Sequence, residues 1–262
     1  MKIDDKIKEI KKNKKIGFMG HIIAGFPDIE TSYQAALGIC EAGADFLEVQ
    51  FPFSDPTADG STIEGACYES LSNGFKIKNG FEIVKRLTQN VTIPILIMTY
   101  SNIVFKYGIE EFVKMAKSSG ATGLIVPDIP IDNDENLNIF CKNYDIANIF
   151  VVAPGCDGKR IKRLSQTGSG FLYTVARRGI TGKKTEIDNE VTGWLKFVRE
   201  NSILPIATGF GLQTKKQIED LVGKSDIAVV GSFFVRSIKE TCEKGYNIKE
   251  SLFNITKGLI IN

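Results

Sequence analysis

LEVQFPFSDPTADG, residues 47–60, joins a strand-like apolar run to a loop that carries carboxylates. Apolar residues at every second position are typical of a strand packed on at least one side, and Glu48 lies inside that run. A buried carboxyl resists ionisation unless it has a partner, so Glu48 is a candidate acid or base. Asp59 follows in the loop at the C-terminal end of this strand, where it can act on a ligand. The structural alternative is a hydrogen-bonded Glu48 and an Asp59 that caps a helix starting near Ser61.

Seven more apolar runs of strand length occur along the chain, and amphipathic stretches separate them. The eight runs begin at residues 16, 46, 93, 123, 149, 170, 204 and 227. Helical patterns such as 109–120 and 214–223 end in glycine, as helix C-termini commonly do. Apolar strands that alternate with helices predict an α/β fold, a parallel TIM (β/α)8 barrel.

A doubly wound open sheet is the alternative fold, but it usually has fewer strands and a glycine-rich phosphate turn after the first strand. The segment GHIIAGFPD, residues 20–28, fits that turn poorly. No linker or shift in composition divides the chain, so we expect residues 1–262 to form one barrel domain.

Composition excludes several classes of function. A net charge of +2 with mixed signs gives no reason to expect nucleic acid or an anionic membrane as a partner. The lysine-rich start is expected to be an extra N-terminal helix with Ile3, Ile7 and Ile10 as its inner stripe, because it lacks the apolar core of a signal peptide. The five cysteines have no CxxC spacing, which suggests neither a disulfide framework nor a metal site and favours a cytoplasmic location.

In such a barrel the chemistry lies at the C-terminal ends of the strands. Besides Glu48 and Asp59, the polar candidates at these ends are His21, Tyr100, Asn102, Asp128 and Tyr173. Glycines after the last strands predict a phosphate site built from backbone N–H groups and a helix N-terminus; they are Gly209, Gly211 and Gly231, the last followed by Ser232. Gly182 lies in a loop, residues 177–187, whose composition suits a mobile lid over the same anion.

With these motifs placed, the chain closely resembles the tryptophan synthase alpha chain family over nearly its whole length. LEVQFPFSDPTADG is similar to the family's signature around its two catalytic carboxylates, a far more specific match than an isolated glycine pattern. The resemblance implies cleavage of indole-3-glycerol phosphate to indole and glyceraldehyde 3-phosphate, the penultimate chemical step of L-tryptophan biosynthesis, without a cofactor in this chain.

The resemblance also implies roles for single residues. Glu48 would be the acid and base that shuttles the proton, and Asp59 would accept a hydrogen bond from the indole N–H. Tyr173, Tyr100 and His21 would contact the substrate, and Thr181 would close on Asp59. The phosphate would be held by four residues, namely Gly182, Gly211, Gly231 and Ser232.

The family's partner is the tryptophan synthase beta chain, which carries pyridoxal phosphate and receives the indole in an alpha2beta2 heterotetramer. The resemblance implies that the loop after the second strand and the segment after the third strand contact the beta chain. The interface residues would be Pro52, Asp55, Pro56 and Asn102. A stand-alone lyase and a catalytically weak allosteric subunit are the alternatives within the family. Another phosphate-sugar barrel enzyme is a rival outside it, but indole-glycerol-phosphate synthase would call for lysines at strand ends.

Several positions depart from the family's usual pattern. Gln50 stands where glycine is common, Ser61 stands where proline usually follows, and Ala176 replaces a serine. His21, the only histidine of the chain, stands at a position that is usually apolar. It is expected to be a hydrogen-bonded wall residue, with a second titrating group beside Glu48 as the alternative.

Overall fold

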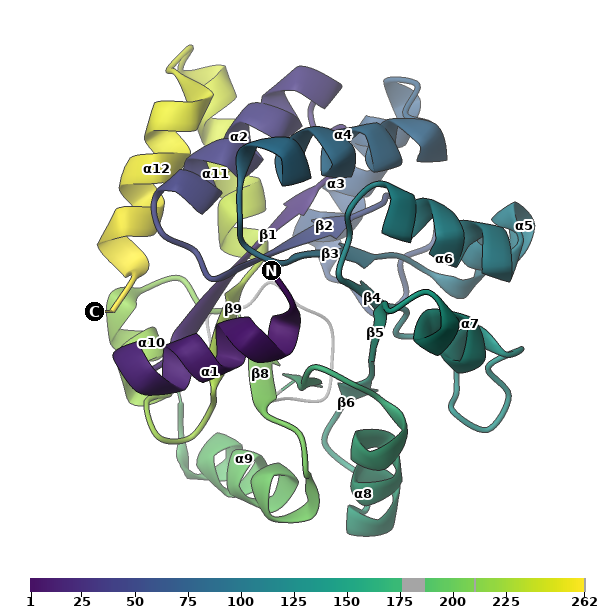
Figure 1. Ribbon diagram of the computed structural model, residues 1–262. Helices are drawn as coiled ribbons and strands as arrows, with labels where there is room; N and C mark the ends of the chain where they lie inside the picture. The colour runs from purple at the N-terminus through teal and green to yellow at the C-terminus, as the bar shows by residue number, and fades with distance from the viewer. Residues whose placement is uncertain (176–186, 210, 262) are drawn as a thin grey trace.

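The parallel strands form a ring that is surrounded by helices (Figure 1). The computed structural model describes residues 1–175, 187–209 and 211–261. The hydrogen-bonded order is β5-β4-β3-β2-β1-β9-β8-β7-β6. The two ends of this order, β5 and β6, are separated in the chain by Phe150 alone, so one chain segment joins them and the ring has eight positions. The predicted (β/α)8 barrel is confirmed.

The strands are β1 Gly17–Ile23, β2 Phe46–Gln50, β3 Ile95–Met98, β4 Gly123–Ile125, β5 Ala147–Ile149, β6 Val151–Val152, β7 Leu172–Val175, β8 Ile206–Gly209 and β9 Ile227–Val230. The helices are α1 Ile3–Asn13, α2 Ile29–Glu41, α3 Ser61–Ser72, α4 Ile77–Asn90, α5 Ser101–Tyr107, α6 Ile109–Ser118, α7 Leu137–Asn143, α8 Gly158–Thr167, α9 Asn189–Asn201, α10 Lys215–Asp220, α11 Ser232–Glu243 and α12 Ile248–Leu259.

The break at Phe150 divides the fifth predicted strand into two segments without interrupting the ring. The carbonyl of Phe150 accepts a hydrogen bond of 2.9 Å from the N–H of Tyr173, so the pairing towards β7 starts within the break. Eight apolar runs therefore correspond to eight positions, although nine strand segments are observed.

The extra N-terminal helix α1 crosses one end of the ring (Figure 1). Its inner stripe of Ile3, Ile7 and Ile10 is buried in the same apolar cluster as residues of the barrel interior, such as Met19 and Phe46. The predicted inner stripe is confirmed. A Cβ at Gly17 would lie 2.7 Å from Cδ1 of Ile10, so the missing side chain lets the helix approach the start of β1. This helix closes the N-terminal end of the barrel.

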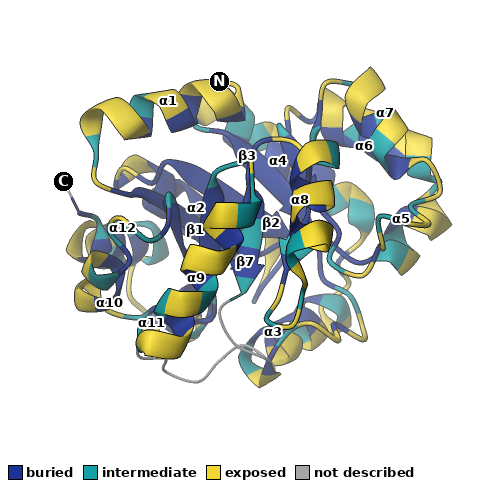
Figure 2. Ribbon diagram, turned by 90° about the horizontal axis from the view of Figure 1, so that it is seen from below, coloured by how far each residue is buried: buried dark blue, intermediate teal, exposed yellow. Residues whose placement is uncertain are grey.

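The outer helices enclose the strands with their apolar faces, and the exposed residues lie on the outside (Figure 2). The first and last of these helices, α2 and α12, pack most closely. A side chain at Gly38 of α2 would collide with the backbone carbonyl of Lys249 in α12. Glycine at this position therefore allows the C-terminal helix to lie against the start of the barrel.

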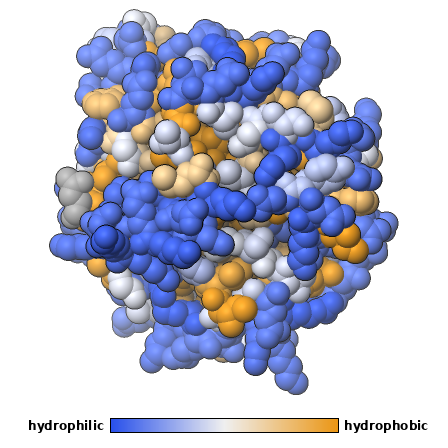
Figure 3. Space-filling model, in the orientation of Figure 1, coloured by the Kyte–Doolittle hydropathy of each residue, from blue (hydrophilic) through white to orange (hydrophobic). Residues whose placement is uncertain are grey.

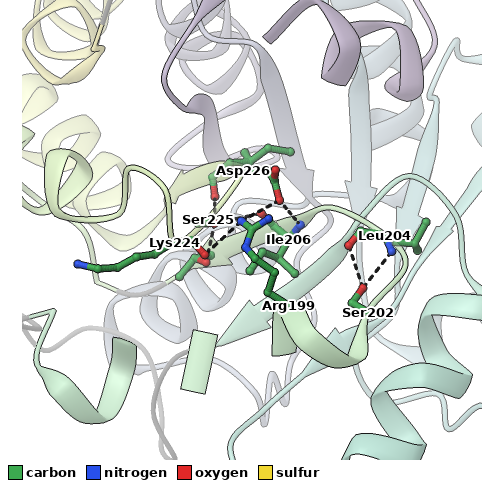
Figure 4. A network of polar contacts seen from close by, with 9 residues as sticks. Arg199, Ser202, Leu204, Ile206, Lys224, Ser225 and Asp226 are labelled. Atoms are coloured by element: carbon green, nitrogen blue, oxygen red, sulfur yellow. Dashed lines mark hydrogen bonds and ion pairs between the residues drawn. The ribbon is translucent and has the colours of Figure 1, made fainter. Parts of the chain in front are cut away.

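Two aspartates at the N-terminal end of the barrel hold neighbouring strands together. Asp226, just before β9, accepts a 2.9 Å hydrogen bond from the N–H of Ile206 and pairs with Arg199 of α9 at 3.2 Å (Figure 4). Asp45, just before β2, accepts from the N–H of Phe18 at 2.9 Å and pairs with Lys14 at 2.7 Å. Each carboxylate thus satisfies a strand N–H and is neutralised by a cation.

The face that carries α1 is mostly hydrophilic (Figure 3). In the part of the chain that the structure describes, no helix is long and apolar enough to cross a bilayer.

Candidate active site

A pocket opens at the C-terminal end of the barrel, opposite α1. Its lining comes from most of the strands and from the loops that follow them. The lining residues are His21, Glu48, Gln50, Ala58, Asp59, Ile63, Met98, Ile125, Pro127, Val151, Tyr173, Val175, Gly209, Gly211, Val229, Gly231 and Ser232. The pocket therefore brings together predicted residues that are far apart in the sequence.

Glu48 lies on β2, between His21 of β1 and Leu96 of β3 in the strand register. Its side chain is buried, and its Oε2 atom has no hydrogen-bond partner. Burial, with the negative charge of Asp59 nearby, raises the pKa of Glu48 to about 8, although a hydrogen bond with Tyr173 opposes the shift. The carboxyl is therefore protonated at neutral pH and can give up its proton within the range where enzymes work.

Asp59 lies in the loop between β2 and α3. Its Oδ2 atom accepts two hydrogen bonds of 2.8 Å, one from Nε2 of Gln50 and one from the hydroxyl of Tyr100. Burial raises the pKa of Asp59, and these two donors oppose the shift. The N-cap of α3 is Gly60, without a side-chain cap, so the alternative that Asp59 caps this helix is wrong. Both donors meet Oδ2, which leaves Oδ1 as the oxygen that can accept from a ligand.

His21 lies on β1 with its Nε2 atom 2.9 Å from Oε1 of Gln50. Burial lowers its pKa to about 4, and the hydrogen bond to Gln50 only partly opposes that shift. The ring is thus neutral at physiological pH. His21 is thus a hydrogen-bonded residue of the pocket lining, and its low pKa argues against a proton shuttle at that pH.

The N-terminus of α11 points into the same pocket. The helix spans twelve residues, begins at Ser232 and follows Gly231. Gly211, from the loop after β8, faces it with a φ of +64°, which favours glycine. A helix N-terminus with free N–H groups and an adjacent glycine loop is a ready anion site.

The other residues that the sequence predicted for the site differ in whether they line the pocket. Tyr173 lines the pocket beside Glu48, whereas Tyr100 is fully buried behind the lining, where its hydroxyl bonds Asp59 and the N–H of Ala58. Thr181 and Gly182 lie outside the described residues, as does Ala176.

Asp128 has a local structural role. Its carboxylate accepts hydrogen bonds from the backbone N–H and the hydroxyl of Ser101, at 2.9 and 2.6 Å, and so holds the first residue of α5.

Two of the four predicted interface residues line a second groove. Pro52 and Asn102 line it, together with apolar residues that include Phe53, Ile103 and Tyr107. Asp55 is exposed and Pro56 is buried in the loop between β2 and α3, outside the lining of this groove.

Sequence reasoning missed the role of Gln50, which appeared only as a departure from a pattern. It also missed the apolar walls that Met98, Ile125 and Val151 supply. A signal for the walls was present, because residues at the C-terminal end of a barrel strand face the interior in alternation. No local signal pointed to Gln50, whose partners come from β1 and from a loop.

The fold and the pocket define the class of protein: a (β/α)8-barrel enzyme whose pocket, at the C-terminal end of the strands, is lined by two carboxyl groups and by the start of α11. The comparisons with known proteins identify the family. Residues 7–258 match the family described as "Tryptophan synthase alpha chain". A tryptophan synthase alpha chain from Helicobacter hepaticus is 48% identical over 228 residues, which cover 85% of each chain. One from Methanocaldococcus jannaschii is 37% identical and covers 95% of this chain and 89% of the relative.

Similarity to a solved structure supports the same family. A mutant tryptophan synthase alpha-subunit from Pyrococcus furiosus superposes with a TM-score of 0.84 at 30% identity, covering 93% of this chain and 97% of that one. This chain belongs to the tryptophan synthase alpha chain family. Its reaction is the carbon–carbon lyase cleavage of indole-3-glycerol phosphate to indole and glyceraldehyde 3-phosphate.

The raised pKa of Glu48 predicts a pH dependence of stability. The folded carboxyl, with its pKa of about 8, binds its proton up to about that pH, whereas the unfolded one releases it near the ordinary pKa of 4.5. The folded state therefore loses stability as pH rises from about 4.5 to about 8, because the unfolded state binds fewer protons there. Glu48→Gln lacks this titration, so its free energy of unfolding minus that of the parent should increase as the pH rises through this window.

The measurement is urea denaturation of both proteins at a series of pH values. The low pKa of His21 acts in the opposite direction, but both proteins share it, so it cancels in the difference. A difference that stays constant between pH 5 and 8 would contradict the raised pKa of Glu48.

Proposed function

We propose that Glu48 and Asp59 carry out the cleavage of indole-3-glycerol phosphate in the pocket at the C-terminal end of the barrel. The observation that supports this most strongly is that the buried Glu48 and the half-buried Asp59 line one pocket together with Gly231 and Ser232 at the N-terminus of α11. The carboxyl groups at one end of such a pocket suit an indole ring that must be protonated. The helix N-terminus at the other end suits a phosphate.

In the proposed first step, the protonated Glu48 donates its proton to C3 of the indole ring, and positive charge develops on the ring nitrogen. In the second step, the hydroxyl on the carbon next to C3 loses its proton to Glu48. The bond from that carbon to C3 breaks, an aldehyde forms and the electron pair returns to the ring. The proton that Glu48 gave is replaced, so the residue ends the cycle protonated. A carboxyl with a pKa near neutrality suits both transfers.

Asp59 would accept a hydrogen bond from the indole N–H and stabilise the positive charge that follows protonation. Its Oδ1 atom is the oxygen available for this bond, because Oδ2 already accepts from Gln50 and Tyr100. Tyr100 therefore acts on the substrate through Asp59. The apolar side chains of Met98, Ile125 and Val151 would pack on the ring, together with Tyr173 and a wall formed by His21.

The phosphate would lie at the N-terminus of α11, with Gly231 and Ser232 on one side and Gly211 on the other. The helix dipole and the free N–H groups favour its negative charge without a lysine. By family resemblance, Gly182 would contribute to this site and Thr181 would close over Asp59.

The proposed partner is a tryptophan synthase beta chain in an alpha2beta2 heterotetramer in the cytoplasm. The beta chain would carry pyridoxal phosphate and receive the indole, whereas this chain would need no cofactor. A solved tryptophan synthase complex from Pyrococcus furiosus, at 29% identity and a TM-score of 0.83, supports the pairing. The apolar groove at Pro52, Phe53 and Asn102 is the proposed contact, because Phe53 in its lining stacks on Tyr100, whose hydroxyl bonds Asp59 of the pocket.

Replacing the proposed acid tests the mechanism. Glu48→Gln keeps the shape of the side chain but has no proton to transfer, so we expect kcat to fall by roughly 10²–10⁴-fold. Binding of a phosphate-bearing substrate analogue should persist. Indole release from indole-3-glycerol phosphate measures the first quantity, and calorimetric titration measures the second.

Glu64→Gln is the matched control, because Glu64 is exposed on the neighbouring helix α3. It should retain the activity of the parent. A Glu48→Gln protein with activity within a few-fold of the parent would rule out Glu48 as the acid.

Replacing a glycine tests the phosphate site. Gly211→Val puts a side chain into the pocket and should weaken binding of glycerol phosphate sharply, by tenfold or more, which corresponds to about 1.4 kcal/mol. Gly223→Val is the matched control. Its φ of +77° imposes a similar backbone strain, but a Cβ there meets open space away from the pocket. Equal binding by both variants, measured calorimetrically, would remove the phosphate from this site.

Mixing with a beta chain from a close relative tests the partnership. We expect indole release by this chain to be slow alone and to rise strongly when the beta chain is added. High activity alone that the beta chain leaves unchanged would instead indicate a stand-alone lyase. Negligible activity in both states, with a beta chain that is nevertheless activated, would indicate an allosteric subunit.

A further inference from the structure

We infer that Gln50 is a positioning residue of the proposed site. Its amide holds the Asp59 carboxylate and keeps the proton of His21 on Nε2, so that Nδ1 of His21 accepts a hydrogen bond from a hydroxyl on the glycerol chain of the substrate. This inference rests on the proposed function for the identity of the ligand. The proton arrangement in the free protein does not depend on it.

The direction of each hydrogen bond follows from a backbone group. The N–H of Ala58 can only donate, and it lies 3.2 Å from the hydroxyl oxygen of Tyr100. That oxygen accepts from Ala58, and its own hydrogen is directed to Oδ2 of Asp59 at 2.8 Å. Gln50 donates to the same oxygen from Nε2, also at 2.8 Å. Two donors on one carboxylate oxygen favour the ionised form of Asp59.

With its NH2 group on Asp59, Gln50 presents only its carbonyl oxygen to His21. The second contact of the same NH2 group, 3.8 Å to Sγ of Cys67, agrees with this orientation. The 2.9 Å contact between Oε1 of Gln50 and Nε2 of His21 therefore needs a proton on Nε2. A neutral imidazole carries one proton, so Nδ1 is left with a lone pair.

Nδ1 of His21 faces the part of the pocket between the carboxyl groups and the anion site. A Cβ on Gly231 would lie 2.7 Å from this atom, so the ring edge adjoins the residue that precedes α11. On the other side, His21 is the register partner of Glu48. Among the described residues, His21 makes no hydrogen bond through Nδ1.

A substrate with its ring at Asp59 and its phosphate at α11 places its glycerol chain in this space. That chain carries hydroxyl groups, which need acceptors when they are buried. Glu48 is protonated before the first step, so it then has one O–H donor and lacks the charge that makes a carboxylate a strong acceptor. The lone pair on Nδ1 supplies an acceptor without adding a charge, so His21 orients the chain and leaves the proton transfers to Glu48.

The single histidine allows a direct test of the proton arrangement. Labelling the free protein with ¹⁵N-histidine gives NMR signals from His21 alone. We expect a protonated Nε2 and an unprotonated Nδ1 from pH 6 to 8. A proton on Nδ1, or a rapid exchange between both forms, would overturn the inference whatever the enzyme does.

Gln50→Met tests the positioning role, because methionine keeps the length of the side chain and removes both hydrogen-bonding groups. We expect the two tautomers of His21 to become mixed and kcat to fall about tenfold or more, since Asp59 loses a donor. Thr99→Val is the matched control, because it removes another buried hydrogen bond beside the site, from Thr99 to the carbonyl of Phe51. It should change neither the tautomer nor kcat. An unchanged tautomer in Gln50→Met would overturn the inference even if its stability falls.

Two ligands separate this inference from the proposed function. In Glu48→Gln, indole-3-glycerol phosphate should bind without being cleaved and should shift the Nδ1 signal as a hydroxyl donates to it. Indole-3-propanol phosphate, which lacks the hydroxyls, should bind and leave that signal nearly unchanged. Equal effects of the two ligands would overturn the contact with His21, with the function intact. Failure of the parent protein to cleave the substrate would overturn the proposed function, and the tautomer of the free protein would still be a separate result.

Discussion

The structure depends most on one constraint, the burial of a carboxyl group inside a closed ring of strands. Glu48 lies in the middle of β2, with strands on both sides, and its Oε2 atom has no hydrogen-bond partner. A charge at this point would be costly, so the group keeps its proton to about pH 8. The barrel thus keeps Glu48 protonated near neutral pH. It does so because the closed ring of strands buries the side chain, which borders only the pocket.

Carboxylates at the two ends of the barrel have different hydrogen-bond and charge partners. At the N-terminal end, Asp45 and Asp226 each accept from a strand N–H and pair with a cation, so their charge is compensated. At the C-terminal end, the described residues that line the pocket include no lysine or arginine. Asp59 is held there by neutral donors, which keep its charge available to a ligand. The stabilising carboxylates and the proposed catalytic ones differ in their partners, and residue type does not distinguish them.

The sequence predicted what depends on local patterns. Apolar runs separated by helical stretches predicted the ring, and the spacing of Ile3, Ile7 and Ile10 predicted the helix that closes it. The position of Glu48 inside an apolar run predicted its burial. Contacts between elements were beyond such patterns, since they depend on strand register and loop path. No local pattern indicated that the carboxylate of Asp128 holds Ser101 at the start of α5, or that the hydroxyl of Tyr100 bonds Asp59.

Gln50 and His21 are two departures from the family's usual pattern. In the structure their side chains are hydrogen-bonded to each other. The side chain of Gln50 is fully buried, so each of its polar atoms needs a partner. Asp59 accepts from its nitrogen, and His21 donates to its oxygen. An apolar residue in place of His21 would leave that oxygen unpaired, and a glycine in place of Gln50 would leave the buried imidazole without its partner. Either change alone costs about 1–3 kcal/mol in unfolding free energy, whereas the two together remove both partners of the Gln50–His21 hydrogen bond, so a glutamine at this strand end and a histidine beside it are expected to occur together.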